Sequence, residues 1–107
     1  MMIMKVSRSF EIFGKEAPEV NQAFMEMSMK AGKASSLDPK TEELAYIAVL
    51  AALRLESGLP FHVKMAKAKG ATRKEVVSAI LVGLPAAGTC VVSSLPIAVD
   101  AYDEKDQ

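Results

Sequence analysis

Apolar side chains recur along most of this chain every three or four residues, which is the period of an amphipathic helix. The interval is clear where Val20, Phe24 and Met27 follow one another, and it predicts a first helix over residues 17–33. Turn-forming residues divide the remainder into further short helical blocks. The pattern predicts an all-α fold, a helical bundle with its core in residues 17–103.

The start of the chain fits this pattern less well. Ile3 to Ile12 is the best strand candidate, since it contains Val6 and Phe10, but three consecutive polar residues interrupt it. Apolar and polar residues must alternate over several positions to predict a strand. We therefore expect residues 1–16 to form an irregular arm ahead of the helical core.

Capping and breaking residues mark the limits of three further helices. Asp38 can accept the free N–H groups of a first turn, while Pro39 has no N–H to lose there. Gly70 marks the end of the helix that begins near Pro60, and a Thr-x-x-Glu capping box marks the start of the next one. The expected helices run from residue 38 to about 56, from 60 to 69, and from the capping box at Thr72–Glu75 to about 84.

The last apolar segment predicts burial against a partner. Residues 86–102 are expected to form a final helix that Leu95-Pro96 interrupts. Its run from Cys90 to Val99 is apolar on nearly every side, as in a helix that is buried all round. Because a chain of 107 residues has few places to bury such a helix, we expect a homo-oligomer.

Composition narrows the possible functions. The 107 residues, with 13 basic and 13 acidic side chains, fit a single domain over residues 1–107. A net charge of zero without a basic run argues against a nucleic-acid partner. No apolar stretch reaches the roughly 18 residues of a membrane span, and the first residues lack a signal-type core, so we expect a cytoplasmic protein without a membrane partner.

The chain contains one cysteine, Cys90, and one histidine, His62. This count excludes an intrachain disulfide and a Cys/His zinc site within one subunit. We expect no metal and no cofactor, so any chemistry must rest on a few titratable side chains. Histidine suits proton transfer at neutral pH, and Glu43 is the most interesting carboxylate because it lies beside the apolar face of the second helix.

Each of these two residues also fits a structural role. His62 has the position of a hydrogen-bonded core or capping histidine, and Glu43 that of an acid favoured by the dipole at a helix start. Glu43 lies on the order of 20 Å along its helix from the turn at Ser57, whereas His62 lies about one turn past it. A simple antiparallel hairpin would keep them apart, so a crossing of the two helices or a partner subunit is needed to join them.

Three segments carry a family resemblance: Leu37–Leu44, Glu56–Ala66 and Lys69–Val76. Together they resemble the carboxymuconolactone decarboxylase and alkylhydroperoxidase D-like family, over a region from Leu37 to Tyr102. The resemblance implies an all-α homo-oligomer, commonly a trimer or a hexamer, with a helical hairpin core and a small-molecule substrate.

In the alkylhydroperoxidase D branch, the family pattern is a glutamate, a CxxC and a histidine four residues after the second cysteine, which act as a thiol peroxidase. Glu43 matches the glutamate and His62 the histidine, whereas Leu55 and Gly58 occupy the cysteine positions. A dithiol cycle therefore cannot run there. Cys90 lies on a later apolar segment, where a buried free cysteine behaves as a small hydrophobe.

The decarboxylase branch also lacks the CxxC and acts on a lactone carboxylate by proton transfer without a cofactor. The resemblance thus implies an enzyme whose catalytic residues are Glu43 and His62. Arg54 and Lys64 flank the turn and are candidates for substrate binding, or are simply solvated. Two alternatives stay open: a peroxidase that works through Cys90, and a non-catalytic family member that binds a ligand.

Overall fold

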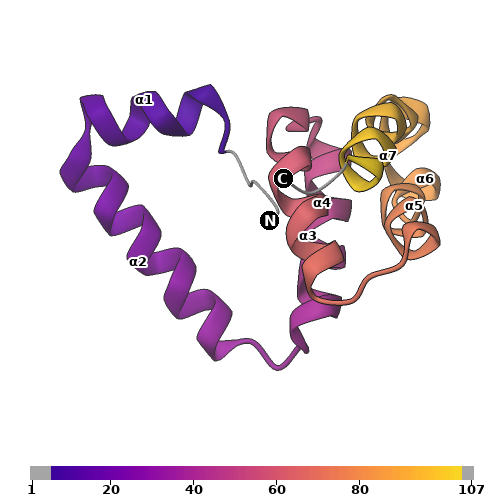
Figure 1. The fold of residues 1–107 in the computed structure, drawn as a ribbon, viewed down its shortest axis with the longest axis horizontal. Helices are drawn as coiled ribbons and strands as arrows, with labels where there is room; N and C mark the ends of the chain where they lie inside the picture. Colours follow the sequence, from indigo (N-terminus) through magenta and orange to yellow (C-terminus); the bar gives the residue numbers. More distant parts are fainter. Residues whose placement is uncertain (1–5, 105–107) are drawn as a thin grey trace.

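The computed structural model describes residues 6–104, which are almost entirely helical and contain no strand (Figure 1). This confirms the all-α prediction. None of the helices in this part of the chain is long and apolar enough to cross a membrane. The elements are α1 (Arg8–Glu16), α2 (Pro18–Ala34), α3 (Pro39–Leu53), the 3-10 turn η1 (Glu56–Gly58), α4 (Leu59–Ala68), α5 (Arg73–Leu81), α6 (Leu84–Ala87), the 3-10 segment η2 (Thr89–Ser94) and α7 (Leu95–Asp103).

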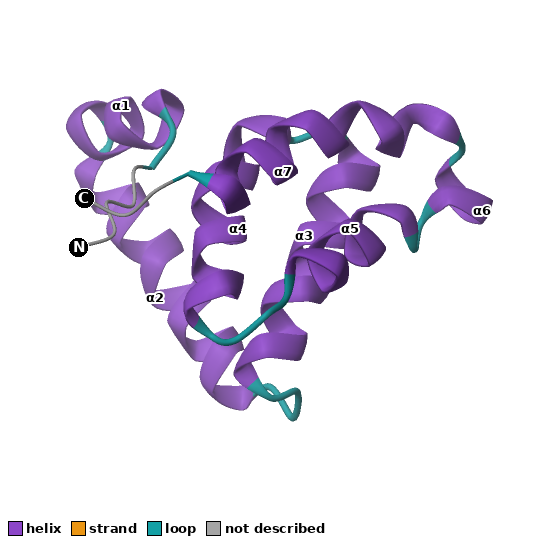
Figure 2. Ribbon diagram, turned by 45° about the vertical axis from the view of Figure 1, so that its right-hand side comes forward, coloured by secondary structure: helices purple, strands orange, loops and turns teal. Residues whose placement is uncertain are grey.

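The core lies between α3, α4, α5 and α7, which pack against one another (Figure 2). Apolar side chains from all four helices and η2 meet there, and burying one such side chain stabilises the fold by about 1.5–3 kcal/mol. The largest apolar side chains that are fully buried are Ile47, Leu59, Val63, Val76, Ile80 and Val91.

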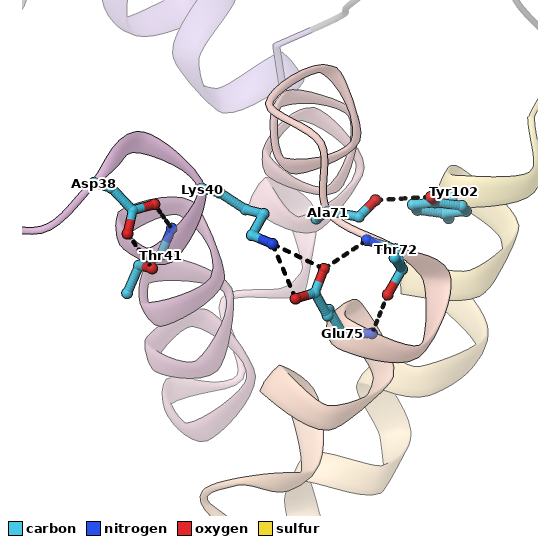
Figure 3. A network of polar contacts seen from close by, with 7 residues as sticks. All are labelled: Asp38, Lys40, Thr41, Ala71, Thr72, Glu75 and Tyr102. Carbon is cyan, nitrogen blue, oxygen red and sulfur yellow. Dashed lines mark hydrogen bonds and ion pairs between the residues drawn. The ribbon is translucent and has the colours of Figure 1, made fainter.

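Two predicted helix starts are confirmed in detail (Figure 3). The Asp38 carboxylate accepts from the backbone N–H of Thr41 at 3.0 Å and from its hydroxyl at 2.7 Å. Thr72 and Glu75 form the reciprocal capping box of α5, with bonds of 2.9 and 3.1 Å. Lys40 also reaches Glu75 at 3.1 Å, so an ion pair joins the start of α3 to the start of α5.

The turn between α3 and α4 differs from the prediction. The second helix was expected to reach Glu56, but α3 ends at Leu53 because Arg54 adopts a left-handed conformation with φ 59°. The N–H of Leu55 then bonds the carbonyl of Leu50 at 2.9 Å, and η1 follows directly. This turn folds the chain back along α3, and α4 starts at Leu59, close to the predicted residue 60.

The prediction of an irregular arm over residues 1–16 is wrong where the structure describes it. Arg8–Glu16 form helix α1, and the Ser7 hydroxyl accepts from the N–H of Phe10 at 3.4 Å. The polar residues that interrupt the strand pattern are thus the cap and first turn of a helix. Ile3 and the rest of the strand candidate up to residue 5 lie outside the described residues.

Helices α1 and α2 form a hairpin that stands apart from the core (Figure 1). The rings of Phe10, Phe13 and Phe24 hold the two helices together, with centroids 5.6–6.1 Å apart. The first predicted helix is therefore present, but within residues 6–104 none of its side chains belongs to the buried core. Val20 is 61% exposed and Met27 56% exposed.

The final segment is more broken than predicted. Helix α5 ends at Leu81 instead of residue 84, and Gly88, with φ 84°, separates α6 from η2. Within the single chain Val91 is fully buried, whereas Val92 is 43% exposed and Cys90 is half-buried, so the predicted burial all round would need a partner subunit. Because a 3-10 helix has about three residues per turn, successive side chains of η2 point in different directions from those of an α-helix, and Val92 lies outside the core.

Candidate active site

Glu43 and His62 lie in direct contact where α3 and α4 pack together. Nδ1 of His62 is 2.7 Å from Oε1 of Glu43. The pair forms within one chain, because Gly58 packs beside Leu50 rather than beyond the end of α3. The fold-back through Arg54 therefore carries His62 up to the level of Glu43, and no partner subunit is needed to join them.

Lys69, at the end of α4, completes this cluster. Its Nζ lies 3.0 Å from Oε2 of Glu43, so both carboxylate oxygens accept a bond from a nitrogen donor. The Glu43 side chain is only 11% exposed, that of His62 24% and that of Lys69 32%. Lys69 is not among the residues predicted from the sequence, although its spacing of seven residues from His62 places both on one face of α4.

The surroundings of Glu43 keep its carboxyl group ionised. Burial raises the pKa of Glu43, but the hydrogen bonds and positive charges of His62 and Lys69 outweigh burial and bring the pKa below its ordinary value. An ionised carboxylate only accepts hydrogen bonds, so Nδ1 of His62 carries the proton that they share. Nε2 is then the ring nitrogen that is left for other chemistry.

Two aromatic side chains fix the plane of the imidazole. The Tyr46 ring stacks on His62 with centroids 4.3 Å apart and an interplanar angle of 29°. Phe61 meets the same ring edge-on at 5.2 Å. Since Tyr46 follows Glu43 by nearly one turn on α3, the same helix both orients the ring and binds its Nδ1.

The other predicted site residues lie elsewhere. Lys64 is buried and forms an ion pair of 2.8 Å with Glu104, the residue after α7. Arg54 is exposed in the turn after α3. Cys90 lies on η2 and its thiol donates to the carbonyl of Ala87 at 3.3 Å. In the described part of the chain, none of the three forms a hydrogen bond with Glu43 or His62.

Potential metal ligands do not gather at the site. Within residues 6–104, no group of three or more His, Cys, Asp or Glu side chains is arranged to hold a metal ion. The polar groups of the site are one carboxylate, one imidazole and one ammonium group. Such a set is suited to proton transfer and to anion recognition.

Comparison with known proteins identifies the family. The profile of the carboxymuconolactone decarboxylase family matches residues 18–100, which is most of the chain. The chain belongs to this family. A structural relative within the carboxymuconolactone decarboxylase family is apo-lpg0406 from Legionella pneumophila, with a TM-score of 0.76 and 26% sequence identity over 89% of this chain and 85% of that one.

A second relative is known from its sequence. An uncharacterized protein of Haemophilus influenzae is 36% identical over 61 residues, which are 57% of this chain and 54% of that protein. The match thus spans about half of the length of that relative. Membership of the carboxymuconolactone decarboxylase family rests on the family profile and the shared fold.

One of the two positions to which the family resemblance assigns a cysteine, Gly58, lies beside the imidazole. A Cβ atom added at Gly58 would lie 4.0 Å from Cδ2 of His62, the ring carbon bonded to Nε2, and 3.4 Å from the nearest atom of Leu50. Gly58 also precedes the first residue of α4. The residue that replaces the second cysteine in this carboxymuconolactone decarboxylase family member therefore leaves space next to the free nitrogen of His62.

Proposed function

We propose that this chain is a cofactor-free enzyme that transfers a proton to carbon in a small-molecule substrate, in a decarboxylation or a related lyase or isomerase step. His62 is the general acid and base, and Glu43 orients it. The observation that carries this proposal is the 2.7 Å contact between the mostly buried Glu43 carboxylate and the only histidine of the chain. The contact protonates Nδ1 and leaves Nε2 for the substrate.

For a β-keto or lactone carboxylate, the proposed reaction is a decarboxylation followed by protonation of carbon. When the bond to the carboxylate carbon breaks, CO₂ leaves and the electron pair passes through the adjacent carbon into the carbonyl as an enolate. The Nε2–H of protonated His62 then gives its proton to that carbon, and the neutral imidazole regains a proton from water. Glu43 stays ionised throughout and stabilises the imidazolium through Nδ1–H.

The position of Cys90 favours proton transfer over thiol chemistry as the function. A reactive thiol needs a neighbouring base or cation that makes it a thiolate. The Cys90 thiol instead donates to the backbone carbonyl of Ala87. A peroxidase that works through Cys90 is therefore the weaker alternative, and a ligand-binding family member without activity is the other.

Turnover of a panel of lactone and β-keto carboxylates, followed by CO₂ release, tests the proposal. General acid–base catalysis contributes about 10²–10⁴-fold, so we expect His62→Gln to lower kcat by a factor in this range and Glu43→Gln to lower it as well. Cys90→Ser is the matched control and should retain full activity. Turnover that survives both site substitutions would overturn the proposal, and peroxide consumption lost in Cys90→Ser would favour the thiol alternative.

A further inference from the structure

A carboxylate substrate needs a cationic partner near His62, and Lys69 is placed to be one. Its ammonium group has three N–H donors, and one of them binds Oε2 of Glu43 at 3.0 Å. Within residues 6–104, no other group accepts a hydrogen bond from this ammonium. Its side chain is 32% exposed, so the remaining donors are open to a small molecule.

The position of Lys69 relative to His62 follows from Glu43. Nζ of Lys69 and Nδ1 of His62 bond to the two oxygens of one carboxylate, at 3.0 and 2.7 Å. Because Nε2 points away from Glu43, a molecule that contacts both Lys69 and Nε2 must extend across the imidazole ring. An incoming anion also meets a Glu43 whose two oxygens are already bonded to donors, which limits repulsion between the two carboxylates.

The charges of the cluster also favour an anion. The charges of Glu43 and Lys69 cancel, so the protonated form of His62, which the proposed reaction needs, leaves the cluster with one net positive charge. A substrate carboxylate neutralises that charge. Binding of the anion and protonation of the imidazole thus stabilise each other.

We infer that Lys69 is the cation that binds the carboxylate of the substrate beside His62. The reaction part of this inference rests on the proposed function, but anion binding is measurable without turnover. Neither cation proposed from the sequence takes this role, because Lys64 is paired with Glu104 and Arg54 lies in the exposed turn after α3.

NMR titration of the intact chain with malonate tests the inference, since His62 is the only histidine and its ring signals need no further assignment. We expect saturable shifts of the His62 ring and of the Lys69 side-chain signals with one apparent Kd. Malonamide, which is uncharged, should cause neither. Sodium chloride at equal ionic strength controls for screening.

Two substitutions separate the charge of Lys69 from its hydrogen bond. Lys69→Gln keeps a donor near Glu43 but removes the charge, and we expect malonate binding to weaken at least tenfold. Lys69→Arg should restore most of it, because a guanidinium also binds carboxylates. Lys74→Met removes one charge at an exposed position of α5 and should bind malonate like the parent chain.

The possible results distinguish this inference from the proposed function. Malonate binding that is equal in Lys69→Gln and the parent overturns the inference, even if turnover depends on Glu43 and His62. Lys69-dependent binding without turnover of any carboxylate supports the inference and removes the proposed reaction. Should Lys69→Gln fail to fold, malonate shifts of His62 without shifts of Lys69 in the parent chain overturn the inference instead.

Discussion

Oε1 of Glu43 lies 2.7 Å from Nδ1 of His62, while Lys69 occupies the other oxygen of the same carboxylate at 3.0 Å. A carboxylate held between two nitrogen donors has a fixed orientation and transmits it to the imidazole. The position of His62 therefore depends on a group that the substrate need not touch. Glu43 is a positioning residue in the proposed mechanism. Protonation of its carboxylate is also expected to change the free energy of unfolding.

The lowered pKa of Glu43 predicts how stability depends on pH. The folded pKa lies below the ordinary value of 4.5, so the unfolded chain takes up a proton first as the pH falls. This contribution to stability is fully present above about pH 4.5 and is lost as the pH falls through the lower folded value. We expect Glu43→Gln to show a flatter loss of unfolding free energy in this range than the parent chain.

Urea unfolding between pH 3 and pH 7 measures this difference. Asp38, Glu75 and Asp103 also have lowered pKa values because of hydrogen bonds with Thr41, Thr72 and Arg73, so the parent chain alone does not isolate Glu43. The difference between the parent and Glu43→Gln removes that shared background. Parallel curves for the two chains would show that Glu43 titrates alike in the folded and unfolded states.

Tyr46 predicts a separate effect on the orientation of the imidazole. Its ring stacks on His62 at 4.3 Å, and such aromatic pairs are worth about 0.5–1.5 kcal/mol beyond the area they bury. Loss of this stack in Tyr46→Ala is expected to lower kcat by roughly 2- to 10-fold. Tyr46→Phe keeps the ring and should retain kcat. Equal kcat values for both variants would show that the stack does not orient His62.

Local signals were sufficient to predict most helix limits. The carboxylate of Asp38 and the Thr72–Glu75 box act on backbone donors within three residues, and both caps form as predicted. Ser7 acts over the same short range, but polar residues next to apolar ones were interpreted as a broken strand. The error there came from the choice of period and not from a missing signal.

The site required information that no local pattern contains. The contact of Glu43 with His62 depends on the left-handed Arg54 and on the packing of Gly58 against Leu50. Arginine rarely adopts φ 59°, so its sequence position did not predict the turn. The family resemblance singled out Glu43 and His62 as a pair, whereas their spacing along the helices alone argued that they lie apart.

The space beside His62 predicts that a thiol site can be restored. Gly58 has an ordinary helical conformation, with φ −85°, and an added Cβ would lie 4.0 Å from the imidazole and 3.4 Å from Leu50. A cysteine there also precedes the first turn of α4, where the helix dipole favours a thiolate. We expect Leu55→Cys with Gly58→Cys to form a disulfide on oxidation and to react with peroxide when reduced.

Mass spectrometry of trapped thiols and a peroxide-consumption assay measure this gain. Leu55→Cys alone is the matched control, because residue 55 is exposed and one thiol cannot complete a dithiol cycle. Addition of His62→Gln to the double variant should slow the reaction, since the imidazole is the nearest base. A double variant that stays inert to peroxide, though folded, would contradict the inferred geometry beside Nε2.

The exposed hairpin of α1 and α2 predicts that the chain self-associates. A compact monomer of 11.5 kDa exposes about 5,800 Å², whereas this chain exposes 7108 Å². The difference is roughly 1,300 Å², more than the ~800 Å² that each partner buries in a standard interface. A net charge of zero adds no repulsion between copies, and the exposed Val20 and Met27 provide an apolar contact surface.

Sedimentation at micromolar concentration should therefore give a multiple of the mass of one chain, and the family resemblance implies a multiple of three or six. We expect Val20→Glu with Met27→Glu to release monomers with unchanged helicity, because both side chains are already exposed in the single chain and their replacement costs the fold little. Gln22→Lys adds a charge on the opposite side of α2, keeps a donor for Glu26 and should leave the assembly intact. A parent chain that sediments as a monomer would show that α1 and α2 remain uncovered. An assembly that survives the double substitution would place its interface on another surface, such as the one around Val92.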